Sequence, residues 1–367
     1  MFSNFFLKSF RILLLPFAFL YGGIVWLRNW LYHKNILKSA TFNLPIICVG
    51  NLSVGGTGKS PMVEYIVKQV HQKHKVAILS RGYKRKTKGY ALADAHSTAI
   101  DIGDEPMQFY HKFPQVPVAV GEERLEAIPQ LLHDRPDTEM IILDDAFQHR
   151  AINAGLNILL TDCNNLFTRD FFLPTGDLRD MRSSYKRAHI IVVTKCAPDM
   201  SEEEKEAVIR EIEPVKGQQV FFTTIAYGEL YHITQKHPFY LEEETAVLLI
   251  TGIANPKPLK TLLEEKVHTY YMMHYGDHHI FTLDDWKDIQ KRFNSMEGEA
   301  GKKIIVTTEK DAMRLLKYDA ELHKLPFYVI PIEHRFLFGE GERFNTAIFD
   351  FISQFKQKMI VSYGTEK

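Results

Sequence analysis

The chain has 367 residues, 45% of them hydrophobic and 25% charged, and a globular chain of this length is expected to form two domains. Its 45 lysine and arginine residues equal its 45 aspartate and glutamate residues in number, so net charge predicts no nucleic-acid partner. The cysteines Cys48, Cys163 and Cys196 lack C-x-x-C spacing, which favours buried, reduced thiols over a disulfide framework or a zinc site.

An apolar segment near the N-terminus is the first predicted element. Residues 12–27 contain no charged side chain, and Trp26 and Trp30 suit the interface of a bilayer. This run is shorter than the roughly 20 residues of a membrane-spanning helix, so lying in the membrane and crossing it both stay open. We predict that residues 1–38 form an apolar membrane-anchor helix. The alternative is a helix packed on the main domain.

A glycine-rich turn at residues 53–60 follows an apolar run and precedes a helical pattern that begins near Met62. This strand–loop–helix context is the one that a phosphate-binding P-loop requires, and an ordinary turn would not need its Lys-Ser ending. Lys59 would neutralise the β- and γ-phosphates of a nucleotide, and the Ser60 hydroxyl would bind Mg²⁺. The predicted nucleotide-binding residues are Ser53, Val54, Gly55, Gly56, Thr57, Gly58, Lys59 and Ser60.

Buried strands recur after the turn, and they predict a parallel sheet covered by helices on both faces. They are expected at residues 76–80, 118–120, 140–143, 158–162 and 190–195. An aromatic and threonine-rich stretch from 219 to 233 breaks this pattern and indicates a hairpin or linker, after which a second α/β series begins at 246. We predict a P-loop domain at 39–217, a linker at 218–240 and a C-terminal α/β lobe at 241–367.

Two pairs of acidic residues are candidates for the chemistry of the P-loop domain. Asp144 and Asp145 end an apolar strand, which is where P-loop enzymes place a carboxylate that organises Mg²⁺. Asp104 and Glu105 open a helix after a glycine. They could act as a general base or a further Mg²⁺ ligand, or they could only cap the helix and favour its dipole.

Polar residues of the second series have structural and functional interpretations. His278 and His279 diverge in an extended chain, so both could be structural, or one imidazole could pair with a first-lobe carboxylate and tune its proton affinity. Thr308 and Asp311 form a plausible helix cap.

Basic residues in two loops of the P-loop domain are candidates for binding an anion. The run that starts at Arg81 would ordinarily be solvated, and beside a phosphate site it could hold an anionic head group. Arg179 lies in a polar loop and could bind phosphate. Ala197 stands where GTPases carry the aspartate that reads guanine, which favours ATP.

In the order of these motifs the chain resembles the tetraacyldisaccharide 4′-kinases of lipid A biosynthesis, and the resemblance extends over nearly the whole chain. The motifs are VGNLSVGGTGKSP at 49–61, SRGY at 80–83, GDEP at 103–106, LDDAFQH at 143–149, PTGDLRD at 174–180, GIANP at 252–256, DHH at 277–279 and TEKD at 308–311. Three residues depart from the family pattern. Asp180 stands where Glu is usual, Ala146 where Gly is usual, and Ser60 where Thr is common.

The resemblance implies two α/β lobes joined by a β-ribbon, with a P-loop NTPase-like parallel sheet in the first lobe, a smaller second lobe and an N-terminal membrane-associated helix. It implies an ATP- and Mg²⁺-dependent kinase at the cytoplasmic face of the inner membrane. Its acceptor would be the 4′-hydroxyl of a tetraacylated glucosamine disaccharide 1-phosphate. No obligate protein partner is evident. Another membrane-associated P-loop NTPase, either a hydrolase or a nucleotide sensor, is the alternative.

Roles for individual residues follow from the resemblance. Asp104 matches the family's proposed base, assisted by His278, with His279 left open, and Lys59 acts on the phosphates. Ser60 matches the Mg²⁺-binding residue of the P-loop, and Glu105, Asp144 and Asp145 match the acidic cluster around the metal. The predicted substrate-binding residues are Arg81, His149, Arg179 and Asp180.

Overall fold

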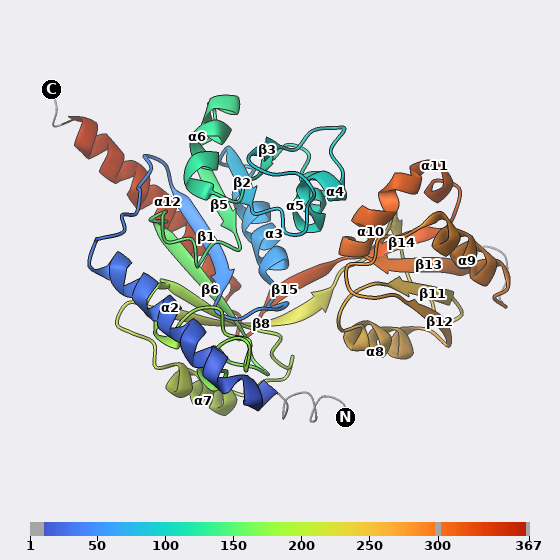
Figure 1. The fold of residues 1–367 in the computed structure, drawn as a ribbon. Coiled ribbons are helices and arrows are strands. Elements are labelled where there is room, and N and C mark those ends of the chain that lie inside the picture. Colours follow the sequence, from blue (N-terminus) through green and yellow to red (C-terminus); the bar gives the residue numbers. More distant parts are fainter. Residues whose placement is uncertain (1–10, 298–301, 365–367) are drawn as a thin grey trace.

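The computed structural model describes residues 11–297 and 302–364, which form two lobes that are each built around one sheet (Figure 1). The first lobe contains a nine-stranded sheet with the strand order β15-β8-β7-β6-β1-β5-β2-β4-β3. Its seven central strands are parallel, and only the edge strands β3 and β15 run antiparallel to their neighbours. The strands are β1 (Ile46–Asn51), β2 (Val76–Ser80), β3 (Ala91–Leu92), β4 (Val118–Val120), β5 (Met140–Asp144), β6 (Leu156–Asp162), β7 (Ile190–Thr194), β8 (Gln219–Tyr227) and β15 (Ile332–Phe336).

Helices cover both faces of this sheet because successive residues of each strand point to opposite sides. Ile47 and Val49 of β1 face the side on which α3, α5 and α12 pack, whereas Ile46 and Cys48 face the side of α6 and α7. The helical segments are η1 (Ile12–Leu14), α2 (Leu15–His33), α3 (Lys59–Val70), α4 (Ala99–Ile102), α5 (Asp104–Lys112), α6 (Arg124–Asp134), η2 (Phe167–Arg169), η3 (Arg182–Arg187), α7 (Glu202–Ile212) and α12 (Gly341–Gly364).

The second lobe contains a six-stranded sheet with the order β10-β9-β14-β13-β11-β12. Strands β11 to β14 are parallel, and β9 and β10 add an antiparallel edge. The strands are β9 (Leu230–His232), β10 (Pro238–Phe239), β11 (Ala246–Thr251), β12 (Thr269–His274), β13 (Lys303–Thr308) and β14 (Phe327–Ile330). The helical segments are α8 (Lys257–Lys266), α9 (Leu283–Asn294), α10 (Glu309–Leu315), η4 (Leu316–Tyr318) and α11 (Asp319–Leu322).

The chain enters and leaves the second lobe along an antiparallel ribbon of β8 and β15, which Figure 1 shows running between the lobes. This differs from the boundaries expected from the sequence. Within 218–240, β8 belongs to the first sheet and β9 and β10 belong to the second. Within 241–367, β15 pairs with β8, and α12 packs on the first lobe through Phe344, Ile348 and Ile352. The assignment of the final helix to the C-terminal lobe was therefore wrong, because the pattern of an amphipathic helix does not specify which lobe buries its apolar face.

Helix α2 lies along the first lobe and contacts it by one narrow face. Ala18, Gly22 and Val25 are buried, and a Cβ atom added to Gly22 would come within 2.9 Å of the Phe172 ring, so glycine permits this close approach. The opposite face exposes large apolar side chains at Phe17, Phe19, Leu20, Ile24, Trp26 and Leu27. Residues 12–33 are long and apolar enough to cross a membrane, and 11% of their apolar window is buried.

Polar contacts fix α2 to the loops beside the carboxyl edge of the first sheet. Asn29 donates to the Asp180 carboxylate at 2.7 Å, and the Tyr21 hydroxyl donates to the Arg179 carbonyl oxygen at 3.0 Å. Arg28 donates to the Gln148 carbonyl oxygen at 2.6 Å. Because these contacts are spread along α2, the helix lies parallel to the surface of the first lobe.

Candidate active site

The glycine-rich turn connects β1 to α3, and the space beside two of its glycines is open. Cβ atoms added to Gly55 or Gly56 would meet no atom within 4 Å, so backbone N–H groups there are accessible to an anion. Gly55 and Gly58 have φ values of 103° and 84°, which favour glycine. Lys59 is the first residue of α3, so the positive end of the helix dipole and a full charge face the same space.

His334 of β15 supports the P-loop from behind, a role that the sequence did not indicate. Its Nε2 atom lies 2.8 Å from the Gly58 carbonyl oxygen and its Nδ1 atom lies 2.9 Å from the Thr223 hydroxyl. Burial lowers the pKa of His334 to about 4, so the ring is neutral. Because the carbonyl can only accept, Nε2 carries the proton and Nδ1 accepts from Thr223.

Asp144 and Asp145 follow one another in the chain but have different environments. Asp144 ends β5, is 4% exposed and accepts a 2.8 Å hydrogen bond from the Ser80 hydroxyl. Burial, with Asp145 and Glu105 nearby, raises the pKa of Asp144 to about 6. Asp145 has a left-handed backbone with φ 49°, which turns its side chain away from that of Asp144.

The Asp145 carboxylate pairs with two basic side chains. Lys59 Nζ lies 3.7 Å from Asp145 Oδ1, and the Arg179 guanidinium grips both carboxylate oxygens, with Nη1 at 3.1 Å from Oδ2. Burial opposes ionisation of Asp145, but Lys59 and Arg179 outweigh it and hold the pKa of this carboxyl at about 2. The two aspartates are therefore chemically distinct: one is already neutralised by protein cations, and the other is not.

Asp104 is the first residue of α5, and its carboxylate contacts side chains of the second lobe. His278 Nδ1 lies 3.0 Å from Asp104 Oδ2, and Arg314 of α10 binds both oxygens of the same carboxylate, with Nε at 3.0 Å from Oδ1. Burial raises the pKa of Asp104, but His278 and Arg314 outweigh this effect and hold it at about 2. His279 instead contacts Asp285 at 2.8 Å, so of the two adjacent histidines only His278 reaches Asp104.

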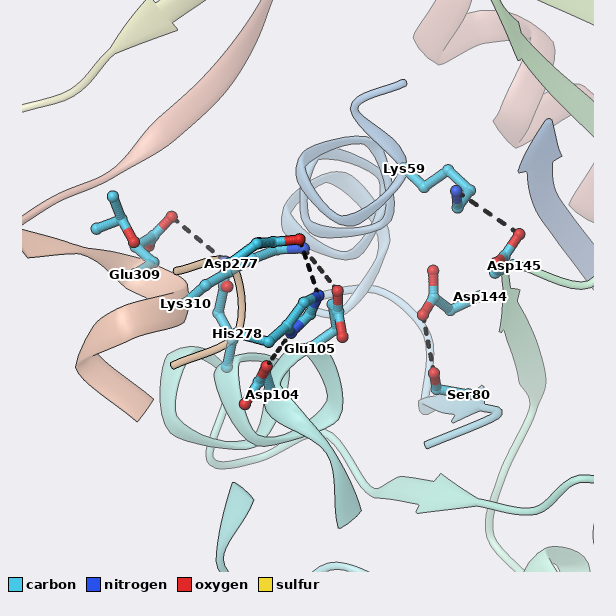
Figure 2. A network of polar contacts seen from close by, with 12 residues as sticks. Lys59, Ser80, Asp104, Glu105, Asp144, Asp145, Asp277, His278, Glu309 and Lys310 are labelled. Atoms are coloured by element: carbon cyan, nitrogen blue, oxygen red, sulfur yellow. Dashed lines mark hydrogen bonds and ion pairs between the residues drawn. The ribbon is translucent and has the colours of Figure 1, made fainter. Parts of the chain in front are cut away.

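Glu105 also receives a cation from the second lobe, because Lys310 Nζ lies 2.5 Å from its Oε1 atom. Glu105 lies near enough to Asp144 for its charge to contribute to the raised pKa of that carboxyl. Figure 2 shows Lys59, Asp144 and Asp145 on one side of the site and Asp104, Glu105 and His278 on the other.

The predicted substrate-side residues have different surroundings. Arg179 lies in the site, where it contacts Asp145 and Asn51. Asp180 is 1% exposed and is bound by Arg187, Asn29 and Ser184, so it supports the loop that carries Arg179 and is not brought to the surface of the site.

Arg81 and His149 could reach an acceptor from the first lobe. Arg81 is exposed directly after β2. His149 is half-buried, and within the described ranges its Nε2 atom is buried without a hydrogen-bond partner.

Mg²⁺ fits the donor set at the carboxyl edge of the sheet. Among residues 11–297 and 302–364, no three His, Cys, Asp or Glu side chains lie close enough to hold a metal ion by themselves. Mg²⁺ in kinases and ATPases is usually held by one or two carboxylates together with substrate phosphates and water. Asp144 is a buried carboxylate that pairs with no Lys or Arg in the described part of the chain, and Ser60 is buried at the start of α3.

The sequence did not single out Arg314, His334, Glu64 or Lys112. Their partners lie up to 276 positions away in the chain, and the spacing of neighbouring residues in a sequence cannot predict contacts between such distant positions. The Thr308 cap expected at the start of α10 is present, since Thr308 accepts from the Asp311 N–H at 3.1 Å.

An open P-loop next to a buried strand-end aspartate, with an acidic pair opposite, defines a P-loop phosphotransferase. The family model described as Tetraacyldisaccharide-1-P 4′-kinase matches residues 10–353. The tetraacyldisaccharide 4′-kinase of Flavobacterium johnsoniae is 44% identical over 345 residues, which are 94% of this chain and 98% of that protein. That of Phocaeicola vulgatus is 42% identical over 353 residues, 92% of this chain and 94% of that protein.

The structural comparison agrees with the sequence comparisons. The crystal structure of LpxK from Aquifex aeolicus in complex with ATP matches with a TM-score of 0.72 and 29% identity, covering 94% of this chain and 99% of that chain. The chain belongs to the tetraacyldisaccharide 4′-kinase family. It is a kinase that transfers phosphate to a hydroxyl group.

Proposed function

We propose that this chain transfers the γ-phosphate of ATP to the 4′-hydroxyl of a tetraacylated glucosamine disaccharide 1-phosphate, with Asp104 as the base. Family membership supports the reaction. The assignment of Asp104 as the base is supported mainly by its contact with His278 of the other lobe. His278 Nδ1 lies 3.0 Å from Asp104 Oδ2, and both residues lie opposite Lys59 of the P-loop. The acceptor hydroxyl would enter between Asp104 and the phosphate held by the P-loop.

Asp104 would orient this hydroxyl and accept its proton, and His278 would share the charge. A carboxyl with a pKa of about 2 is a weak base, but the loose transition state of phosphoryl transfer needs positioning more than strong proton abstraction. Arg314 keeps Asp104 ionised and fixes the direction of its oxygens. Lys59 would leave Asp145 for the β- and γ-oxygens, and Arg179 would keep Asp145 neutralised.

Asp144 and Ser60 would hold Mg²⁺, and Glu105 would complete the acidic surroundings. When bound, Mg²⁺ neutralises charge on the phosphate oxygens. A buried carboxylate whose ionisation is disfavoured gains most from a divalent cation, and this favours Asp144 over Asp145 as the direct ligand. Glu105 would exchange its contact with Lys310 for this role.

Arg81 and His149 would bind the anionic acceptor directly, and Arg179 would add positive charge on the acceptor side while it stays on Asp145. Asp180 would act through the loop that it fixes. An exposed arginine and an imidazole nitrogen without a partner can bind phosphate or sugar oxygens. Contacts of this kind would orient the disaccharide with its 4′-hydroxyl towards Asp104.

The substrate's acyl chains would stay in the bilayer while α2 lies in the membrane interface. The exposed apolar face of α2 and its attachment along the lobe support this arrangement. We place the protein at the cytoplasmic face of the inner membrane, where ATP is present, without an obligate protein partner.

The test is incubation of the purified protein with γ-labelled ATP, Mg²⁺ and the detergent-dispersed disaccharide 1-phosphate. Label is expected on the lipid, at the 4′ position. ATP hydrolysis without labelled lipid would instead identify a nucleotide hydrolase, and ATP binding without turnover would identify a sensor.

A further inference from the structure

Three helices begin at the candidate active site, and each carries candidate residues in its first turns. Helix α3 begins with Lys59 and Ser60, and α5 begins with Asp104 and Glu105. Helix α10 belongs to the second lobe and carries Lys310 and Arg314, which bind Glu105 and Asp104. The relative placement of these helices therefore sets the distance between the phosphate site and the base.

The same three helices meet again at a buried charge cluster behind the site. Lys112, the last residue of α5, has its ammonium 2.5 Å from the Glu64 carboxylate of α3 and 2.6 Å from the Glu309 carboxylate of α10. The Glu64 and Glu309 side chains are 3% and 5% exposed, and that of Lys112 is 18% exposed. Gln108 of α5 donates to both carboxylates, at 2.6 and 3.3 Å.

Charges alternate along the contact between α5 and α10. Asp104 and Glu105 of α5 face cations of α10, and two turns later Lys112 of α5 faces an anion, Glu309. Sliding or rotating one helix against the other would bring like charges together, so the pattern favours one register. In the proposed reaction the contact between Lys310 and Glu105 would be released when Mg²⁺ binds, whereas the pair of Lys112 and Glu309 lies away from the reacting groups.

We propose that Lys112 is a positioning residue for phosphoryl transfer, because it holds α3, α5 and α10 in one register through Glu64 and Glu309. This inference rests on the proposed function. Lys112 would keep the two lobes docked while Glu105 leaves Lys310, and Arg314 would stay on Asp104. The Asp104 carboxylate would then stay aligned with the phosphate above Lys59.

Lys112 links the two lobes and does not only neutralise a buried negative charge. Its ammonium contacts one carboxylate from each lobe, Glu64 from the first and Glu309 from the second. Burial disfavours the charged form of Lys112, but Glu64 and Glu309 outweigh burial and raise its pKa, so it is charged. Tyr231 also donates to Glu309, at 3.4 Å, and Lys236 lies near enough to influence the cluster.

The test compares Lys112→Met, Lys112→Arg and the double variant Lys112→Met/Glu309→Gln in the lipid kinase assay. Lys112→Met is expected to lower kcat at least tenfold and to leave the Kd for Mg·ATP within twofold of native, whereas Lys112→Arg keeps most of kcat. The double variant restores the net charge of the cluster without the bridge, and its kcat is expected to stay low. Lys68→Met, which removes a more exposed pair with Glu333, is the matched control and should leave kcat unchanged.

A native kcat for Lys112→Met, or a recovered kcat for the double variant, would overturn the positioning role. Folding of each variant is checked by circular dichroism and by Mg·ATP binding. If Lys112→Met does not fold, Glu309→Gln alone carries the test, since it removes the second-lobe partner and leaves the first-lobe pair intact. Solution scattering tests the inference independently of lipid turnover: Lys112→Met should enlarge the radius of gyration and Lys112→Arg should not.

Discussion

At the scale of single residues, the carboxylates of the candidate active site differ in the side chains that they contact. The carboxylates of Asp104, Glu105 and Asp145 each contact a lysine or arginine, whereas the Asp144 carboxylate contacts only the Ser80 hydroxyl among the described side-chain hydrogen bonds and ion pairs. A buried carboxylate without a counter-ion is costly unless it is protonated or binds a cation. This difference supports distinct roles for two aspartates that are adjacent in the sequence.

Replacing Asp104 with alanine should lower kcat for lipid phosphorylation by about 10²-fold or more, which is the usual contribution of a positioned general base. The Kd for Mg·ATP should stay near the native value, because Asp104 belongs to α5 and not to the P-loop. Steady-state kinetics with isothermal titration of Mg·ATP checks both quantities. Near-native turnover in this variant would remove Asp104 from the role of base.

At the scale of elements, strand β15 connects the inter-lobe ribbon to the P-loop. Its His334 ring lies against Gly58, and a Cβ atom on that glycine would come within 2.9 Å of the ring. Glu333 of the same strand pairs with Lys68 of α3. The strand that returns from the second lobe therefore contacts both the nucleotide loop and the helix behind it.

His334→Ala should weaken Mg·ATP binding by about tenfold. The change removes a hydrogen bond to the Gly58 carbonyl oxygen, and such bonds contribute about 1 kcal/mol, with unsatisfied buried groups costing somewhat more. Isothermal titration at pH 7.5 measures the effect. Because the His334 pKa is about 4, native affinity should show no His334-dependent change between pH 6 and 8, and a change that His334→Ala abolishes would contradict the neutral tautomer.

Replacing Phe19 and Ile24 of α2 with serine should weaken vesicle binding by about tenfold or more. Each apolar side chain that leaves a bilayer costs about 1.5–3 kcal/mol. The two side chains are 75% and 61% exposed, so the melting temperature should not fall. Vesicle sedimentation and thermal unfolding measure the two effects, with Leu125→Ser on α6 as an exposed control. Unchanged sedimentation of the double variant would rule out α2 as the membrane contact.

At the scale of the whole molecule, the lobes are docked through charged side chains as well as through the ribbon. The buried cluster of Glu64, Lys112 and Glu309 contains two carboxylates and one ammonium. Burial, followed by the charge of Glu309, raises the pKa of Glu64 to about 7, above its ordinary value of 4.5. The fold therefore binds a proton at Glu64 more tightly than the unfolded chain does.

This raised pKa makes native stability fall as pH rises from about 4.5 to about 7, because the folded state holds the proton that the unfolded state releases. The loss from this one group approaches about 3 kcal/mol above pH 7, at about 1.4 kcal/mol for each pKa unit. Glu64→Gln should flatten that part of the profile. Urea unfolding at a series of pH values measures it, and a variant profile parallel to the native one would contradict the assignment.

Much of the first lobe could be predicted from its sequence because local patterns determine it. The Gly55–Ser60 turn and the run that ends at Asp144 each lie on the strand or helix junction that their residues indicate. The destination of residues 332–364 could not be predicted, because an amphipathic helix fits either lobe equally well. The contacts of Arg314 and Lys112 also escaped prediction, since each depends on how two distant helices pack.

The pairing of β8 with β15 makes the second lobe an insertion whose two ends nearly touch, since the Gly228 N–H donates to the Pro331 carbonyl oxygen at 3.1 Å. The ribosome therefore completes the insertion before it supplies β15, whose His334 supports the P-loop. Domains generally fold as units during synthesis, the earlier ones first. In this chain the P-loop gains its support from His334 only after residues 228–331 have been synthesised, so full ATP affinity is expected only once the inserted lobe has emerged.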